Sequence, residues 1–461
     1  MDETYNDSAF SERRALRPYS IIVVGAGIGG LAIGLSMRKT GHDVRILEKR
    51  HEITEVGAGI QIPPNASRIL RRFGVLDEVM KHATVLERNS LRVRRWKDDE
   101  ELGSVPLVPD IEDNFGAPLA VIHRADLQRV LLNAAIECGC KILEDHEVVD
   151  IDRKFLPVKK LITLNRRLLV RSRGAKTWMS ADVILAADGM NSIVRRRMAI
   201  ASGYDDQLMP AGELAYRFLL PREAIKHDEA AMALLSKNHG MRYMGPGGHI
   251  MAYPLRNNTL YNVVLIRQAE SKQMQKTTWT TRARKEDIMK QYRGWCPIIH
   301  TLISHVPSSG ALETPMNNMP PLPTWVKGCI ALAGDACHYM LPYVAQGAAN
   351  ALEDAGTLAM AFTCTDRIEL ALDLYQFIRK HRSEWIQASA TSNGHILHLP
   401  DGEEQRRRDD SIRAAHTGSG TNPDKWNDKK TREFMWHVDV MAETINEFES
   451  LAREASLNKK R

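Results

Sequence analysis

Three glycines at fixed spacing and a distant glutamate form the most informative pattern in this chain. Gly25, Gly27 and Gly30 follow an apolar segment, and Glu48 lies 23 residues beyond Gly25. Such glycines permit a tight turn, a close backbone approach to a pyrophosphate, and close packing of a helix on a strand. The glutamate can accept hydrogen bonds from a ribose 2′-OH. The pattern predicts a site for FAD or NAD, and the alternative is a glycine-rich turn that binds no ligand.

The segments around these residues have the periodicity needed to position them. Residues 21–24 are apolar and rich in β-branched side chains, which indicates a buried strand. Residues 31–37 indicate a helix closed by Gly41, and residues 43–47 indicate a second strand. The helix would present its free N–H groups and the positive end of its dipole to the phosphates.

Two later segments end in an aspartate beside a glycine. Asp188-Gly189 and Gly334-Asp335 each follow a short apolar segment that indicates a buried strand. Asp335 is placed to accept hydrogen bonds from a polyol chain. A helix beginning near Gly347 would direct its N–H groups at a reduced, anionic ring system. For either motif alone, the alternative is a strand-to-helix turn with an aspartate cap.

Together these motifs resemble those of the FAD-dependent aromatic hydroxylases (group A flavoprotein monooxygenases), most closely the salicylate-hydroxylase-like branch. The resemblance covers about residues 18–395. Besides the glycine pattern, it rests on the stretches 57–66, 123–127, 187–189 and 334–338. It implies an α/β fold in which a Rossmann-type, glutathione-reductase-like FAD-binding domain carries an inserted β-sheet substrate domain and is followed by C-terminal helices.

The resemblance also implies which residues bind the cofactor. Glu48 would bind the adenosine ribose, Arg124 would contact FAD, and Asp335 would bind ribityl or ribose oxygens. Ala348 would offer its amide to the pyrimidine edge of the flavin. Many relatives have glycine where this chain has Ala345, a change that reduces backbone freedom beside the ring. The implied cofactor-binding residues are Gly25, Gly27, Gly30, Glu48, Ala58, Gly59, Arg124, Asp335, Gly347 and Ala348.

The reaction implied by the family uses FAD bound tightly but not covalently, with NAD(P)H as a transient cosubstrate. Reduced flavin reacts with O2 to give a C4a-hydroperoxide, which hydroxylates an electron-rich aromatic small molecule, usually a phenol, as in secondary metabolism. The protein supplies placement and excludes water. A second glycine pattern in a βαβ context is missing from the sequence, so a dedicated NAD(P) domain is not expected.

Substrate-binding residues are expected on the strand-rich segment 212–267. Arg217, in a Tyr-Arg pair similar to the family's, would hold a phenolate or carboxylate. Tyr243 and Tyr253 would donate a hydrogen bond to the substrate oxygen, and His338 would orient the substrate or relay a proton. The alternatives are a solvent-facing arginine, packing tyrosines and a structural histidine, and no metal site is indicated.

Two rival functions remain. The first keeps the cofactor but changes the reaction to epoxidation or Baeyer–Villiger-type insertion on a terpenoid or alkaloid. The second is a non-catalytic binding protein of the Rab-escort kind, which shares the overall fold. The Asp335 motif and Arg124 favour a flavin enzyme over that binding protein.

Composition indicates an ordinary cytoplasmic enzyme. The chain has 461 residues, 43% apolar residues and a net charge of +6 spread along its length, which favours neither nucleic acid nor a stable membrane association. Its six cysteines lack zinc spacing. The polar N-terminus lacks an apolar signal segment, and no stretch reaches the length of about 18 apolar residues that a transmembrane helix needs.

The motifs and composition also suggest domain boundaries. Residues 1–17 are expected to be disordered. The predicted FAD-binding domain is discontinuous and comprises 18–92, 119–200 and 315–395. The predicted substrate domain comprises 93–118 and 201–314, and a C-terminal helical segment comprises 396–461.

Overall fold

The structure is a computed structural model that describes residues 12–53, 58–86, 91–152, 167–269 and 281–458. Residues 1–11, which belong to the segment expected to be disordered, lie outside these ranges. Gly57, which belongs to one of the stretches that resemble the family, also lies outside them. Ala15 N–H donates to Thr40 O at 2.9 Å, so the chain contacts the body of the protein before the first strand.

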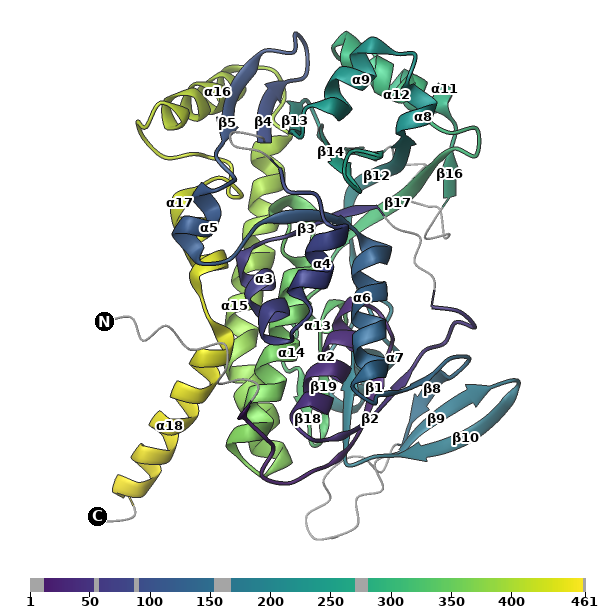
Figure 1. The fold of residues 1–461 in the computed structure, drawn as a ribbon, viewed down its shortest axis with the longest axis vertical. Coiled ribbons are helices and arrows are strands. Elements are labelled where there is room, and N and C mark those ends of the chain that lie inside the picture. Colours follow the sequence, from purple (N-terminus) through teal and green to yellow (C-terminus); the bar gives the residue numbers. More distant parts are fainter. Residues whose placement is uncertain (1–11, 54–57, 87–90, 153–166, 270–280, 459–461) are drawn as a thin grey trace.

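A six-stranded sheet forms the lower layer in Figure 1. Its strand order is β18-β19-β11-β1-β2-β7, and all neighbouring pairs are parallel except β18 with β19. The central strands are almost completely buried, as expected for a parallel sheet covered on both faces. The strands are β1 (Ser20–Val24), β2 (Asp43–Leu47), β7 (Lys141–Leu143), β11 (Val183–Ala186), β18 (Val326–Lys327) and β19 (Ile330–Leu332). The predicted β-strand, helix and second β-strand around the glycine pattern are confirmed.

The helices that pack against this sheet begin at the carboxyl ends of its strands, where the glycine pattern and the aspartate motifs lie. α2 (Ile28–Lys39) follows β1 directly and packs against α14 (Gly347–Cys364) and α6 (Arg124–Glu137). Shorter elements complete this part: α3 (Pro64–Arg72), α4 (Leu76–His82), α5 (Asp110–Phe115), α7 (Ile193–Ser202), α13 (Asp335–His338), η2 (Pro342–Val344), and the paired strands β3 (Gly59–Ile62) and β6 (Ala120–His123). A small antiparallel sheet of β8 (Glu147–Ile151), β9 (Arg167–Ser172) and β10 (Ala175–Ser180) lies at its lower edge in Figure 1.

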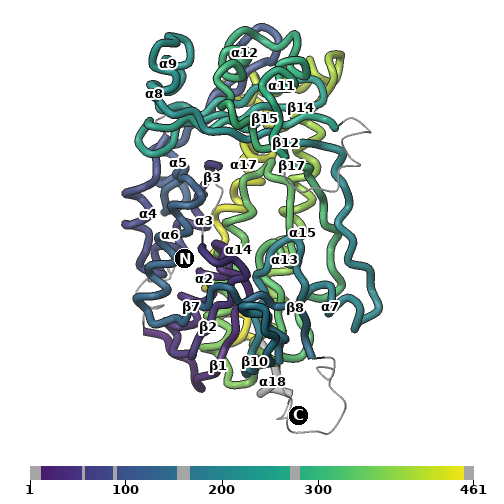
Figure 2. Tube along the Cα trace, turned by 90° about the vertical axis from the view of Figure 1, so that its right-hand side faces the viewer, coloured from purple at the N-terminus to yellow at the C-terminus, as the bar shows by residue number. Residues whose placement is uncertain are grey.

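An eight-stranded sheet forms the upper layer, with order β16-β17-β12-β15-β14-β13-β4-β5. Its strands are β4 (Leu91–Arg95), β5 (Glu101–Val105), β12 (Met209–Pro221), β13 (Gly240–Gly245), β14 (Gly248–Leu255), β15 (Leu260–Gln268), β16 (Thr281–Ala283) and β17 (Ala311–Asn318). Figures 1 and 2 show that its outer side carries α8 (Arg222–Ile225), α9 (Glu229–Ser236), α11 (Lys285–Gln291) and α12 (Pro297–Ser304). Its inner side faces the six-stranded layer.

The C-terminal third links the two layers. α15 (Ile368–Leu397) is a 30-residue helix that extends from the lower layer toward the upper sheet (Figure 1). α16 (Glu403–His416) packs on β5, and α18 (Val440–Asn458) packs on α14 and α15. α17 (Lys429–Arg432) and η3 (Glu433–His437) connect α16 to α18. In the described part of the chain, no helix combines the length and apolar character that crossing a membrane requires.

Candidate active site

A cavity of about 960 Å³ lies between the two layers and is lined from both. This volume is at the upper end of the range of about 300–1,000 Å³ typical of small-molecule and cofactor sites. The cavity brings together the glycine pattern, both aspartate motifs and the N-terminus of α14. The predicted cofactor residues that line it are Gly25, Gly27, Glu48, Ala58, Gly59, Arg124, Asp335, Gly347 and Ala348.

The glycine turn fits a dinucleotide for steric reasons. Gly25 has φ +96°, and a Cβ there would lie 2.6 Å from Ala187 O. A Cβ at Gly30 would lie 1.9 Å from Gly25 O, so Gly30 packs beneath the turn and does not line the cavity. Gly27, in contrast, has nothing within 4 Å of its Cβ position. Since α2 has no side-chain cap, its first N–H groups are free to bind a phosphate in that open space.

Glu48 is held at the edge of the cavity by two backbone amides. Ala26 N–H donates to Glu48 Oε2 at 3.0 Å, and Arg50 N–H donates to Oε1 at 2.9 Å. Each carboxylate oxygen has further acceptor capacity, which ribose hydroxyls can use. This geometry fits the ribose-binding role that the resemblance implies.

The N-terminus of α14 forms the floor of the cavity. Residues 345–348 line the cavity, and the first turn of the helix has neither a side-chain cap nor an acidic residue. Its N–H groups and positive dipole end therefore favour a negatively charged ring edge. Ala345 adopts a left-handed conformation, φ +55° and ψ +39°, which costs a non-glycine residue about 1 kcal/mol or more. Ala345 thus holds a backbone conformation that glycine adopts more readily.

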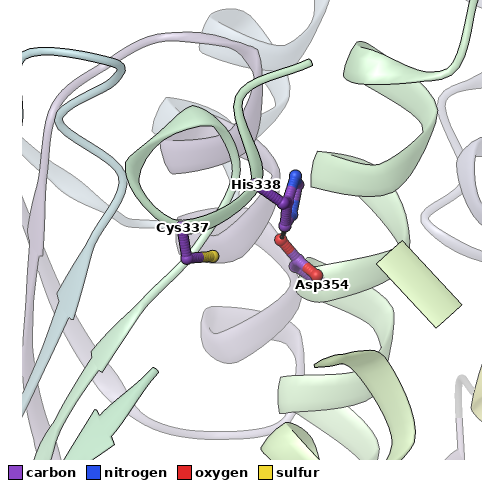
Figure 3. A group of neighbouring side chains, drawn as sticks. All are labelled: Cys337, His338 and Asp354. Atoms are coloured by element: carbon purple, nitrogen blue, oxygen red, sulfur yellow. Dashed lines mark hydrogen bonds and ion pairs between the residues drawn. The ribbon is translucent and has the colours of Figure 1, made fainter. Parts of the chain in front are cut away.

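His338 does not reach the cavity, which corrects its expected role in catalysis. Its side chain is fully buried, and its Nε2–H donates to Asp354 Oδ2 at 2.6 Å (Figure 3). Asp354 also accepts from Gly334 N–H at 2.8 Å and from Arg379 Nε–H at 2.9 Å. Burial alone would raise the pKa of Asp354, but His338 and Arg379 lower it. His338 thus belongs to a buried brace beneath the Gly334 turn.

The same group contains Cys337, and its sulfur, the His338 ring and Asp354 present ligand atoms within 4.8 Å of one another. Figure 3 shows the three side chains converging between α13 and α14. Asp354 already receives three hydrogen bonds, and burial raises the pKa of the Cys337 thiol. The arrangement therefore fits a hydrogen-bonded brace better than a metal site.

The upper wall of the cavity consists of residues on five strands of the eight-stranded sheet, with a single residue, Arg242, from β13 and alternate residues from the others. Because side chains alternate between the faces of a strand, every second residue reaches the cavity. The alternating residues are Arg217 on β12; His249, Met251 and Tyr253 on β14; Val264 and Ile266 on β15; and Leu312, Thr314 and Met316 on β17. This wall is mainly apolar and carries a few polar groups, as small-molecule sites do.

Arg217 is the notable charge in that wall. Among the described residues its guanidinium has no hydrogen-bond or ion-pair partner. Burial lowers the pKa of Arg217, although an arginine remains protonated in proteins. An unpaired cation in an apolar wall favours an anionic or ionisable ligand group.

Tyr243 lies on the wrong face of its strand for the expected role. Arg242 on β13 lines the cavity, so its neighbour Tyr243 points to the outer face and packs with the helices there. The Tyr243 hydroxyl donates to Asp99 Oδ1 at 2.8 Å. Tyr253 lines the cavity, and a Cβ at Gly59 would lie 2.6 Å from its Cε2 atom.

Two polar groups of the wall were missed by the sequence reasoning. His249 lies four residues before Tyr253, and this spacing places both on one face of β14, a signal that could have found it. Arg242 forms a buried ion pair with Asp424, which lies between α16 and α17. Burial, together with His398 and Arg242, lowers the pKa of His249 well below its usual value. His249 is therefore neutral near pH 7.

Comparison with known proteins identifies the family. A protein-family model described as an FAD binding domain matches residues 18–388, which is most of the chain. The FAD-dependent monooxygenase atnJ of Arthrinium sp. is 35% identical over 416 residues, which is 89% of this chain and 92% of atnJ. The 3-hydroxybenzoate 6-hydroxylase of Klebsiella oxytoca is 31% identical over 389 residues, 84% of this chain and 90% of that enzyme. The chain therefore belongs to the FAD-dependent monooxygenase family that includes the aromatic hydroxylases.

Solved structures show the same fold. A salicylate hydroxylase in complex with substrate superposes with a TM-score of 0.73 at 24% identity, covering 93% of this chain and 97% of that one. HpxO of Klebsiella pneumoniae, complexed with FAD and uric acid, gives a TM-score of 0.71 at 23% identity, covering 86% of this chain and 92% of that one. The predicted fold class and the predicted FAD cofactor are confirmed.

Proposed function

We propose that this FAD-dependent monooxygenase hydroxylates a small aromatic substrate, preferably a phenol, using NAD(P)H and O2. One observation carries the proposal. The apolar wall opposite the dinucleotide-binding turn contains a partly buried cation, Arg217, without a partner among the described residues. A phenolate or aromatic carboxylate has both the flat apolar body and the charge that such a wall accommodates.

The similar proteins support this substrate class. Relatives with high coverage bear names that specify a hydroxylase of 3-hydroxybenzoate and a monooxygenase of 3-amino-4-hydroxybenzoate. Both substrates are phenolic benzoates, which combine a hydroxyl group with a carboxylate. Arg217 would bind a carboxylate or phenolate by a charge-assisted contact.

Each part of the cavity has a distinct task in this proposal. Bound FAD supplies the redox chemistry and the activation of oxygen. Glu48 and Asp335 hold the cofactor's hydroxyl groups, and the N-terminus of α14 stabilises negative charge at the ring. Arg217 orients the substrate, and the neutral His249 is available to accept a hydrogen bond from its hydroxyl. The apolar side chains of β15 and β17 exclude water from the reacting atoms.

The proposed location is the cytoplasm. None of the six cysteines forms a disulfide, and four of them are buried. Reduced thiols are usual in a compartment where glutathione and thioredoxin are active.

Product analysis tests the proposal directly. The yellow holoenzyme would be incubated with NADH or NADPH, isotopically labelled O2, and a panel of 3-hydroxybenzoate, salicylate and simple phenols. The expected product is a ring-hydroxylated compound carrying one labelled oxygen atom, formed in proportion to the NAD(P)H oxidised. The rival function is an epoxidase or a Baeyer–Villiger-type oxygenase. It would replace the proposed one if the enzyme converts an alkene to an epoxide, or a ketone to an ester, and reacts with no phenol.

A further inference from the structure

A chain of hydrogen-bonded side chains leads from the cavity toward the outside of the protein. His249 Nδ1 lies 2.7 Å from His398 Nε2, and His398 Nδ1 lies 2.8 Å from Glu213 Oε1. The hydroxyl of Tyr343 donates to the other carboxylate oxygen of Glu213. The four residues come from β14, the segment after α15, β12 and η2. Only the fold brings them together.

The two ends of this chain have different surroundings. His249 and Tyr343 line the cavity, whereas His398 and Glu213 do not. The side chain of His398 is 7% exposed and that of Glu213 is 13% exposed. The carboxylate thus retains contact with solvent outside the cavity, while His249 faces inward.

Hydrogen-bond chemistry determines which way the protons point. An ionised Glu213 can only accept, so His398 Nδ1–H donates to it. Neutral His398 then accepts at Nε2 from His249 Nδ1–H. This leaves His249 Nε2 as a bare acceptor, and no described residue occupies it. The orientation of a histidine by a second histidine and a carboxylate fixes its tautomer.

The charges around His249 oppose a stable positive charge on its ring. The positive charge of Arg242 approaches the His249 ring from β13. The centre of the Tyr343 ring lies 5.2 Å from the centre of the His249 ring, and the His398 ring stacks on the His249 ring at 5.0 Å. Burial, with His398 and Arg242 beside the ring, lowers the pKa of His249. A proton taken up at Nε2 is therefore passed on. The path for it leads to His398, whose ring also contacts the Glu213 carboxylate.

We propose that His398 and Glu213 are positioning residues that make His249 the proton acceptor for the substrate's hydroxyl group. The O–H bond of the substrate breaks as an N–H bond forms at His249 Nε2. At the same time the Nδ1 proton of His249 moves to His398 Nε2. The result is a phenolate in the cavity and a His398 imidazolium paired with Glu213. This inference rests on the proposed phenolic substrate, and His398 lies beyond the matched family region, 18–388.

The test uses nitrophenols, because their phenolate form is coloured and no turnover is needed. Each nitrophenol isomer would be titrated with pH while bound to the FAD-loaded enzyme. The wild type is expected to lower the pKa of the bound phenol. His398→Ala and Glu213→Gln are each expected to raise that pKa by about one unit or more relative to the wild type. Glu213→Gln keeps the side-chain size, so the test remains valid if His398→Ala folds poorly.

Two controls separate positioning from general structural damage. His395→Ala alters an exposed histidine in the last turn of α15, three residues before His398. Nitrophenols bound to this variant should titrate as they do in the wild type. In a His249→Asn background, His398→Ala should cause no further shift, because the acceptor is already gone. FAD content is measured for every variant to confirm that the site is intact.

The outcomes are distinguishable. If bound nitrophenols titrate identically in the wild type, His398→Ala and Glu213→Gln, the positioning role is wrong while phenol hydroxylation stands. If no nitrophenol binds and no phenol is hydroxylated, both proposals are wrong.

Discussion

At the scale of single residues, the phase of a strand decides which side chains reach the cavity. Arg217 on β12 and Tyr243 on β13 are both strand residues of the same sheet, but only Arg217 lines the cavity. Its neighbour Tyr216 points to the outer face, as Tyr243 does. Arg217, a charge without a partner among the described residues on the inner face, is therefore a better candidate for substrate binding than Tyr243, whose hydroxyl already has a partner on the outer face.

Arg217→Met should retain FAD and lose catalytic efficiency. Removing one charge-assisted contact to the substrate costs about 1.5–3 kcal/mol, so kcat/KM should fall by about 10- to 100-fold. Steady-state oxygen uptake with the identified substrate measures this, and flavin absorbance reports cofactor retention. Tyr243→Phe is the matched control. It should keep wild-type turnover and lose only about 1 kcal/mol of stability with the Asp99 hydrogen bond. Equal kcat/KM for Arg217→Met and the wild type would remove Arg217 from the site.

At the scale of elements, α14 is held in place by buried ion pairs rather than by its apolar face alone. Glu353 and Asp354 sit within the helix and are fully or almost fully buried. Burial alone would raise the pKa of Glu353, but Arg382 and Arg379 from α15 outweigh it and lower the pKa. These contacts fix the N-terminal half of α14, whose first turn lines the cavity.

Arg379→Met should destabilise the protein and weaken FAD retention. The substitution leaves Asp354 and Glu353 with fewer partners in a buried site, and breaking such a pair costs about 3–5 kcal/mol. The thermal midpoint and the FAD dissociation constant would be measured. Lys380→Met, at the next position, removes only the partly exposed pair with Glu384 and should cost less than about 1 kcal/mol. Comparable losses in both variants would contradict the role of the brace.

The unit of β1, α2 and β2 contains a pH-sensitive residue, His42, which lies just before β2. Burial lowers its pKa from 6.5 to about 4. Its Nδ1 accepts from Tyr19 N–H at 3.1 Å, so the neutral form is the one that fits. Between these two pH values the unfolded chain binds the proton and the native protein does not. Stability is therefore full above pH 6.5 and decreases as the pH falls toward 4.

His42→Asn should reduce this pH dependence. The asparagine oxygen can replace Nδ1 as acceptor but does not titrate. The wild type should lose on the order of 3 kcal/mol between the two pH values from this group, and the variant should lose none of that amount. Thermal midpoints of both holoproteins at neutral and mildly acidic pH provide the measurement. Parallel decreases in the two proteins would show that other groups cause the acid sensitivity.

At the scale of the whole molecule, the sequence predicts features built from neighbouring residues. It does not predict contacts between residues that lie far apart in the chain. The turn at Gly25 and the aspartate at position 335 were predictable, because each motif consists of neighbouring residues with a local steric purpose. Ala345 was identified as a departure, and its left-handed backbone explains why glycine is natural there. The pairing of His249 with His398, 149 residues apart, leaves no local pattern.

The C-terminal segment is the part that sequence reasoning described least well. The sequence predicts only that this segment is helical, yet it contributes partners to two cavity residues. His398 contacts His249, and Asp424 pairs with Arg242. Arg72 on α3 forms an ion pair with Asp439 at the start of α18. The segment therefore acts as an outer shell of the active site as well as a clamp on the FAD-binding layer.

Asp424→Asn tests this view of the whole molecule. The carboxylate neutralises Arg242, so its loss would expose a second positive charge at the cavity wall besides Arg217. Affinity for benzoate, an anionic aromatic probe, should increase by about tenfold, equivalent to about 1.4 kcal/mol. The thermal midpoint should fall, because Arg242 becomes a buried charge without its partner. Both quantities can be followed through flavin fluorescence of the holoenzyme. Unchanged benzoate affinity together with a lower midpoint would assign Asp424 a purely structural role and detach the C-terminal segment from substrate binding.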